Sequence, residues 1–159
     1  MTHEKDLHYI RLAVEAARKG VVQNEGGPFG TVIVKNDMIV GTGNNKVVST
    51  NDPTAHAEVV AIREACRNLK SYQLTGCTVY TSCEPCPMCL GAIYWARPDR
   101  IVYACSKEDA ASIQFDDDFI YREITLPVAE RKIPTSQCGR DLGMEVFRFW
   151  EKKDDKIQY

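Results

Sequence analysis

Apolar residues recur along the chain at two spacings, one typical of helices and the other typical of strands. Over residues 4–19, the apolar positions Leu7, Ile10, Val14 and Ala17 lie three or four residues apart, which predicts a helix. Short apolar or β-branched runs predict strands at 31–34, 38–42, 77–81 and 100–104. Further helices are predicted at 55–69, 87–96 and 142–151. This alternation of strands and helices predicts a three-layer α/β domain with a mixed sheet.

The composition fits one globular domain. The chain has 159 residues, of which 44% are hydrophobic and 26% are charged, and this suffices for one buried core. Residues 1–159 are therefore predicted to form a single domain. The N-terminus mixes charges without an apolar segment, and the longest apolar run is too short to span a membrane. We therefore expect a cytoplasmic protein with no membrane partner.

The cysteine count and the net charge restrict the function further. In a chain without an export signal, the seven cysteines are expected to be reduced, so metal binding or catalysis is favoured over disulfides. The net charge of −2 and the isoelectric point near 5.9 disfavour a large contact with nucleic acid phosphates. A nucleic acid partner is therefore not expected.

Three cysteines share the stretch C-E-P-C-P-M-C, at Cys83, Cys86 and Cys89. A ferredoxin-type iron–sulfur cluster would need a fourth cysteine four positions after Cys89, where the chain has Ile93. Zinc is compatible with this run, because the Cys86-x-x-Cys89 spacing lets two thiolates bind one ion. The stretch therefore favours a zinc site.

A histidine and a glutamate elsewhere in the chain could complete that site. His56 follows the helix-entry signal N-D-P-T, and together with Cys86 and Cys89 it would give three ligands and an open fourth position, as in catalytic zinc sites. Glu58 could reach the same ion only at an irregular first helical turn, because residues i and i+2 point apart in a regular helix. A water molecule could occupy the open fourth position of the zinc ion. A carboxylate beside that water can take a proton from it and return the proton to a leaving group. The four residues together would form a hydrolytic site.

The spacing of these residues resembles a known family. H-A-E at 56–58, followed by P-C-x-x-C at 85–89, is similar to the signature of the zinc-dependent cytidine and deoxycytidylate deaminase superfamily. The resemblance implies a cytidine-deaminase-like α/β/α domain with a mixed five-stranded sheet, and Glu58 as the proton shuttle. It leaves Cys83 outside the ligand set. It also implies one zinc ion per subunit, with water or hydroxide as fourth ligand and three protein ligands: His56, Cys86 and Cys89.

Within this superfamily the chain looks like the bacterial guanine deaminases. The similar segments are G-G-P-F-G at 26–30, N-D-P-T-A-H-A-E at 51–58, the cysteine segment at 82–96, F-D-D-D-F-I-Y at 115–121 and the terminal tyrosine. The resemblance implies a hydrolase that converts guanine to xanthine and ammonia in purine catabolism or salvage.

The same resemblance implies roles in substrate binding and proton transfer. Asn45 would bind the purine, and Asp117 would assist proton transfer, although its neighbours Asp116 and Asp118 remain alternatives. Phe29 and Trp95 flank the motifs and are predicted either to grip the flat base or to be core aromatics.

The C-terminal segment is expected to act in a dimer. The resemblance implies a homodimer in which residues 140–159 are exchanged between subunits and Tyr159 closes over the partner's pocket. The aromatic residues Phe147, Phe149 and Trp150 would anchor this segment.

Other functions remain open at this point. Guanosine deaminases resemble the chain around F-D-D and at the terminal tyrosine, and tRNA adenosine deaminases share H-A-E and P-C-x-x-C. The mixed C-terminal segment E-K-K-D-D-K-I-Q-Y differs from the basic helix usual in tRNA deaminases. A zinc module without enzymatic activity is the alternative of a different class.

Overall fold

The computed structural model describes residues 2–159, apart from the side chain of Thr2. The strands are β1 (Gly30–Lys35), β2 (Met38–Asn44), β3 (Cys77–Cys83) and β4 (Arg100–Cys105). The helices are α1 (Thr2–Val22), α2 (Val47–Thr50), α3 (Ala57–Leu69), α4 (Pro87–Ala96), α5 (Lys107–Ser112), α6 (Asp118–Thr125) and α7 (Arg140–Glu151), with a 3₁₀ turn η1 (Val128–Glu130).

The four strands form one mixed sheet in the order β2-β1-β3-β4. Strand β1 is antiparallel to β2 and β3, whereas β3 is parallel to β4. The four strands predicted from the apolar runs are confirmed, but the five-stranded sheet expected from the resemblance is wrong. Among the described residues, the chain after β4 forms helices and irregular segments only. A capping box between Ser106 and Asp109 starts α5 directly after β4, and the later apolar residues recur at helical spacing in α7.

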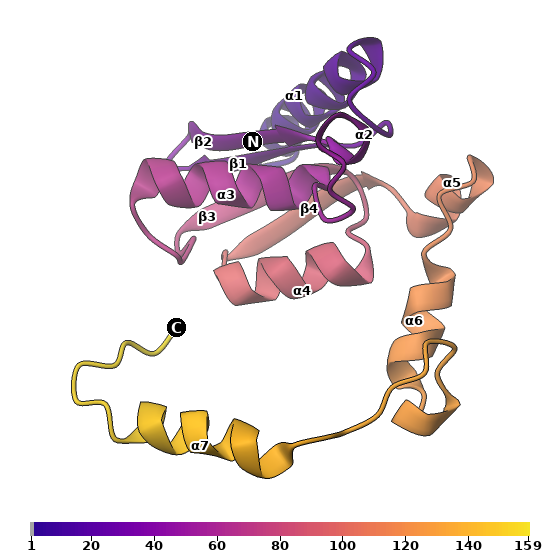
Figure 1. Ribbon diagram of the computed structural model, residues 1–159. Helices are drawn as coiled ribbons and strands as arrows, with labels where there is room; N and C mark the ends of the chain where they lie inside the picture. Colours follow the sequence, from indigo (N-terminus) through magenta and orange to yellow (C-terminus); the bar gives the residue numbers. More distant parts are fainter. Residues whose placement is uncertain (1) are drawn as a thin grey trace. The chain divides into compact units, whose positions relative to one another are not determined.

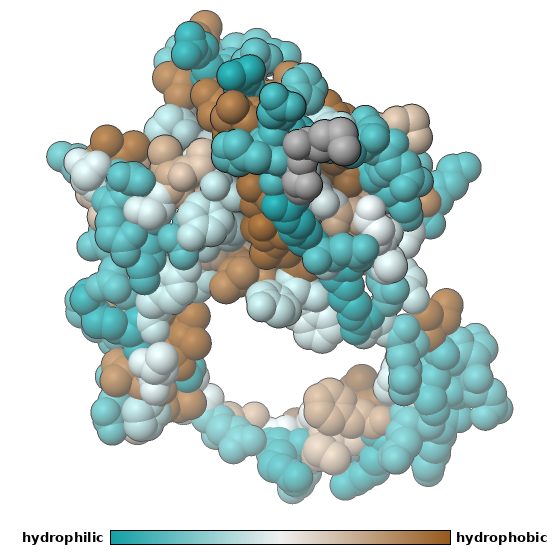
Figure 2. Space-filling model, turned by 180° about the vertical axis from the view of Figure 1, so that it is seen from behind, coloured by the Kyte–Doolittle hydropathy of each residue, from teal (hydrophilic) through white to brown (hydrophobic). Residues whose placement is uncertain are grey.

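Helices cover both faces of the sheet, which confirms the three-layer prediction (Figure 1). On one face, Tyr9 and Ala13 of α1 pack against Val32 and Val34. On the other, α3 and α4 enclose a core that includes Ile33 of β1. Successive residues of β1 thus serve opposite cores, as the alternation of side chains in a strand requires. The outward residues of α1 are mostly hydrophilic (Figure 2).

The first turns of helix α3 pack closely against strand β2. A Cβ on Gly43 of β2 would collide with the Ala57 carbonyl oxygen and the Ala61 amide nitrogen. The missing side chain therefore lets the helix backbone lie directly on the strand. The N-terminal turn of α3, which follows His56, is held at the end of β2 in this way.

The chain divides into two compact units, the first ending at Asp118 and the second comprising Phe119–Tyr159. The second unit contains most of α6, the turn η1 and α7. None of the residues 119–159, all of which are described, is buried. Its apolar residues therefore form no core of their own.

Candidate active site

Two helix starts bring a histidine and a cysteine together. His56 is the N-cap residue of α3 and Cys86 is the N-cap residue of α4, and both have extended backbone conformations. Neither side chain makes the usual hydrogen bond to its own helix. Instead, Nδ1 of His56 lies 3.5 Å from the Sγ atoms of both Cys86 and Cys89.

These three residues have the geometry and the chemistry of a metal site. Their ligand atoms lie within 4.8 Å of one another, and no other such group is found in residues 2–159. Cys89 is buried, while His56 and Cys86 are half-buried. One imidazole and two thiolates are ligands that suit zinc, and three protein ligands leave one position for a reactant. The residues present therefore fit zinc, as the sequence predicted.

Hydrogen bonds among the three cluster residues shift their pKa values. A hydrogen bond from Cys89, with a further one from His56, lowers the pKa of Cys86 to about 4. The same contact with Cys86, together with burial, raises the pKa of Cys89. The hydrogen bond with Cys86 raises the pKa of His56. These hydrogen bonds favour the thiolate form of Cys86, which is the form that binds a metal.

Glu58 lies beside this cluster despite the unfavourable i, i+2 spacing. The helix starts at Ala57, so His56 is outside the regular turn and the two side chains can converge. The carboxyl group of Glu58 is only 6% exposed and interacts with the thiol of Cys89. Burial raises the pKa of Glu58. The group is therefore suited to gain and lose a proton.

Cys83 is not equivalent to the other two cysteines of the run. It ends β3, is buried, and donates its S–H to the carbonyl oxygen of Ser106 over 3.5 Å. Burial raises the pKa of Cys83 to about 11, so it remains a neutral thiol at neutral pH. Its side chain is not part of the cluster of ligand atoms.

Asp117 interacts electrostatically with His56 and Cys86 of the cluster. Burial first, and then the charge of Cys86, raise the pKa of Asp117, and Asp117 in turn contributes to the raised pKa of His56. Asp116 is exposed, and its Oδ1 accepts a hydrogen bond of 2.9 Å from the amide of Asp118. The side chain of Asp116 is thus used in a local turn just before α6, which leaves Asp117 as the better candidate for chemistry.

An edge-to-face pair of aromatic rings lies near this segment. The ring of Phe29 packs against Phe115 with centroids 5.0 Å apart and planes at 90°. Gly27 makes room for this contact, because a Cβ there would meet the Phe115 ring. The sequence indicated Phe29 as a wall for a base but gave no sign of its contact with Phe115.

Asn45 is a buried polar residue at the end of β2. It is 5% exposed, and its backbone amide donates to the Phe29 carbonyl oxygen over 3.0 Å. Its Oδ1 accepts from the Val47 amide over 3.1 Å, which directs the Nδ2 group away from that backbone. The next amide, of Lys46, donates to the carbonyl oxygen of Ala55, which immediately precedes His56. The polypeptide that carries Asn45 is thus bonded to the residue beside the histidine.

The remaining predicted residues lie elsewhere. Trp95 is on α4 and 65% exposed, and it lines a surface hollow with Leu90, Gly91 and Tyr94 rather than with the cluster. Tyr159 is in the second unit and is 70% exposed.

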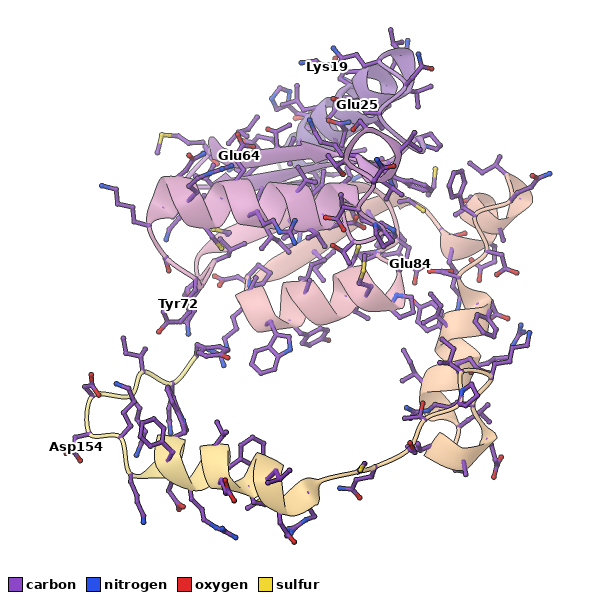
Figure 3. All side chains as sticks on the ribbon, in the orientation of Figure 1. Lys19, Glu25, Glu64, Tyr72, Glu84 and Asp154 are labelled. Atoms are coloured by element: carbon purple, nitrogen blue, oxygen red, sulfur yellow. The ribbon has the colours of Figure 1, made fainter. Side chains whose placement is uncertain are left out.

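Glu84 is a residue that the sequence did not indicate. Its amide donates to the Cys105 carbonyl oxygen over 2.8 Å, and its Oε2 accepts from the Lys107 amide over 3.1 Å (Figure 3). Glu84 thereby ties the end of β3 to the segment that leads to Asp117. Contacts between segments this far apart leave no periodic pattern that could have revealed them.

The comparison with known proteins defines the class. Residues 3–105 match the cytidine and deoxycytidylate deaminase zinc-binding region, which includes all three residues of the cluster. The chain therefore belongs to the cytidine and deoxycytidylate deaminase family, whose members are hydrolases. None of the described helices has the length and apolar character needed to cross a membrane.

Particular relatives are similar over most or all of the chain. The guanine deaminase of Bacillus subtilis (strain 168) is 52% identical over 159 residues, which is 100% of both chains. The X-ray structure of guanine deaminase from Bacillus subtilis superposes with a TM-score of 0.94 and covers 100% of this chain and 99% of that one. A tRNA-specific adenosine deaminase of Buchnera aphidicola subsp. Schizaphis graminum is 36% identical over 144 residues, or 90% of this chain and 95% of that protein.

Proposed function

We propose that this protein is a zinc-dependent guanine deaminase, which hydrolyses the amino group at C2 of guanine to give xanthine and ammonia. The observation that carries the choice of substrate is the 52% identity to a guanine deaminase over the whole chain. The choice of chemistry is supported by a three-ligand cluster with a buried carboxyl group beside it.

One zinc ion per chain would be held by His56, Cys86 and Cys89. When bound there, zinc would lower the pKa of a coordinated water towards neutrality and stabilise the negative charge that develops on its oxygen. Cys86 and Cys89 lie at the N-terminal turn of α4, whose amides favour thiolates, and two thiolates would neutralise the charge of the ion.

Glu58 would move the protons of the reaction. The attacking water transfers one proton to Glu58 as its oxygen bonds to C2, and Glu58 delivers that proton to the adjacent ring nitrogen. Glu58 then moves the second water proton to the amino group, the C2–N bond breaks, and ammonia leaves with xanthine as the other product. The burial of Glu58 keeps bulk water from competing for these transfers.

Asp117 would assist the transfer of protons to the leaving amine, and its exposed neighbour offers a matched control. We expect Asp117→Asn to lower kcat about 10- to 100-fold, because a general acid–base group is removed. Asp116→Asn should keep activity within about twofold, because the side-chain oxygen of asparagine can still accept the hydrogen bond from the amide of Asp118. Steady-state kinetics of the two variants test this. Equal losses in both variants, or none in either, would contradict the assignment to Asp117.

The substrate would be bound by Asn45 and by the aromatic rings. The Nδ2 group of Asn45 is the donor directed away from the backbone, and it can pair with an acceptor on the edge of the purine. Phe29, supported by Phe115, offers an aromatic wall. Trp95 would contact the substrate only in the assembled dimer, since its side chain is exposed in the single chain.

Turnover of a panel of amino heterocycles tests the proposal. Guanine, guanosine, cytosine and adenosine within a tRNA anticodon stem are compared by ammonia release from the zinc-loaded protein. We expect guanine to have the highest kcat/KM. A preference for guanosine or for tRNA would overturn the choice of substrate, and inactivity towards the whole panel would favour the zinc module without activity.

We further propose that the protein is a homodimer in which residues 140–159 are exchanged and Tyr159 closes the partner's site. Helix α7 supports this, because Leu142, Val146, Phe149 and Trp150 form an exposed apolar stripe in a unit without a core. A single domain over residues 1–159 in the cytoplasm is part of the same proposal, since a reducing compartment keeps the cysteines free.

Mixing two inactive variants tests the exchange. A variant lacking Tyr159 should lose activity while retaining zinc, and Glu58→Gln lacks the proton shuttle. If the segment is exchanged, heterodimers contain one site with both Glu58 and a partner's tyrosine. When the two variants are denatured, mixed in equal amounts and refolded together, half of the dimers should be heterodimers. Each heterodimer has one complete site out of two, so roughly a quarter of wild-type turnover should return. Absence of recovery in verified heterodimers would contradict the exchange.

A further inference from the structure

The carboxylate of Glu25 holds both neighbours of Asn45. Its Oε2 accepts a hydrogen bond of 2.6 Å from Nδ2 of Asn44, and its Oε1 accepts one of 3.3 Å from Nζ of Lys46. These bonds, with that of Asn44 first, lower the pKa of Glu25, so the carboxylate is charged at neutral pH. The Glu25 carboxylate thus accepts hydrogen bonds from the residues on both sides of Asn45.

The backbone around Glu25 supports the same segment. The carbonyl oxygen of Glu25 accepts from the amides of Val48 and Ser49, at 3.1 Å and 3.0 Å, and so holds the start of α2. Gly26 makes room for the side chain of Asn45, because a Cβ there would collide with Oδ1 of Asn45. The Glu25–Gly26 pair therefore forms the wall against which the Asn45 carboxamide lies.

Glu25 itself is anchored by α1. Its amide donates to the carbonyl oxygen of Gly20 over 2.9 Å, and its side chain is 21% exposed. Figure 3 labels Glu25 at the loop after α1 and Glu64 on α3. A rigid helix end thus sets the position of the strand end that presents Asn45.

We propose that Glu25 is a positioning residue for guanine recognition, which acts through Asn45 rather than by touching the base. The proposal rests on the proposed function of Asn45. A preorganised donor costs less conformational entropy when substrate binds, so loss of Glu25 weakens binding more than it slows the chemical step. The residue is then a determinant of KM and leaves the zinc cluster intact.

A double-mutant cycle tests whether Glu25 acts through Asn45. We expect Glu25→Ala to raise the KM for guanine about tenfold with kcat changed less than about threefold, the size expected for losing hydrogen bonds to a charged group. In an Asn45→Ala background the same substitution should have no further effect on KM. Glu25→Gln should recover part of the wild-type KM, because its amide oxygen can still accept from Asn44. Equal fold-changes in both backgrounds would overturn the proposal.

Glu64, on α3, supplies a matched control because it contacts the same strand. Its Oε2 accepts a hydrogen bond of 2.6 Å from the amide of Thr42, two residues before Asn44. Glu64→Ala also removes a carboxylate that holds β2, but not one beside Asn45. Its KM should stay within about twofold of wild type. A KM increase as large as that of Glu25→Ala would mean that Glu25 only stabilises the strand.

A measurement without substrate separates this proposal from the proposed function. Hydrogen exchange at the amides of Asn45 and Val47 should accelerate about tenfold in Glu25→Ala and not in Glu64→Ala. Unchanged exchange overturns the positioning role even if guanine is the substrate. If exchange is faster but the wild-type protein is inactive towards guanine, the positioning role of Glu25 is supported. The proposed substrate is then wrong.

Discussion

Glu58→Gln is expected to lower the turnover of guanine by a factor of about 10² to 10⁴, which is the usual contribution of a general acid–base group. Glutamine has nearly the same shape but does not exchange protons, so both proton transfers lose their carrier. The side chain is buried and outside the set of metal ligands, so zinc content and fold should be preserved. Steady-state kinetics, with zinc measured by atomic absorption, provide the comparison.

Glu64→Gln is the matched control, because it makes the same chemical change on the same helix away from the cluster. It should retain turnover within about twofold of wild type. Near-normal activity of Glu58→Gln would rule out the shuttle role. Loss of zinc from that variant would instead show that Glu58 supports the metal.

The second large effect is expected at the cysteine run, where one thiol should matter for zinc and its neighbour should not. Cys86→Ser removes a ligand, so zinc affinity should fall by more than the roughly 100-fold typical of losing an outer hydrogen-bond partner. Turnover should fall with it, and the free energy of unfolding should decrease, because metal binding stabilises the folded state. Competition with a chromogenic chelator measures the affinity.

Cys83→Ser tests whether Cys83, unlike Cys86, does not bind zinc. It removes only the buried S–H donor to the Ser106 carbonyl oxygen, and serine can make that bond. Zinc affinity should stay within about threefold of wild type. Equal loss of zinc from both variants would show that Cys83 is a ligand and that the three-residue cluster is incomplete.

The strands and the metal cluster could be predicted because each leaves a local signal. The apolar and β-branched runs predicted β1 to β4. The entry signal before His56 and the helix predicted over 87–96 agree with the structure, which places His56 and Cys86 as N-caps. The start of α3 at Ala57 also explains how Glu58 lies beside the cluster despite its spacing from His56. Short-range patterns were sufficient for the strands and helix starts, whereas joining His56 to Cys86, 30 positions away, rested on the ligand count and the family resemblance.

Other features depended on contacts between distant segments. The equal spacing of Cys83, Cys86 and Cys89 does not by itself show the change from strand to helix between the first two. The family resemblance left Cys83 outside the ligand set, and the fold supplies the physical reason. The links made by Glu25 and Glu84 join residues 19 to 23 positions apart and follow no periodicity. Local patterns therefore could not predict them.

The resemblance to a family also misled in one respect. It implied a fifth strand, although the segment after β4 begins with a capping box, which is a helix signal. The local sequence was the better guide at that position. The exposed apolar stripe of α7 is the observation that supports the proposed dimer.

Hydrolysis of guanine in water enriched in oxygen-18 tests the central claim most directly. We predict that the zinc-loaded protein releases xanthine and ammonia in equal amounts, and that each xanthine carries one labelled oxygen at C2. Removal of zinc should abolish the reaction and its return should restore it. Absence of xanthine from a folded, zinc-loaded protein, or xanthine without the label at C2, would contradict the proposed hydrolytic deamination of guanine.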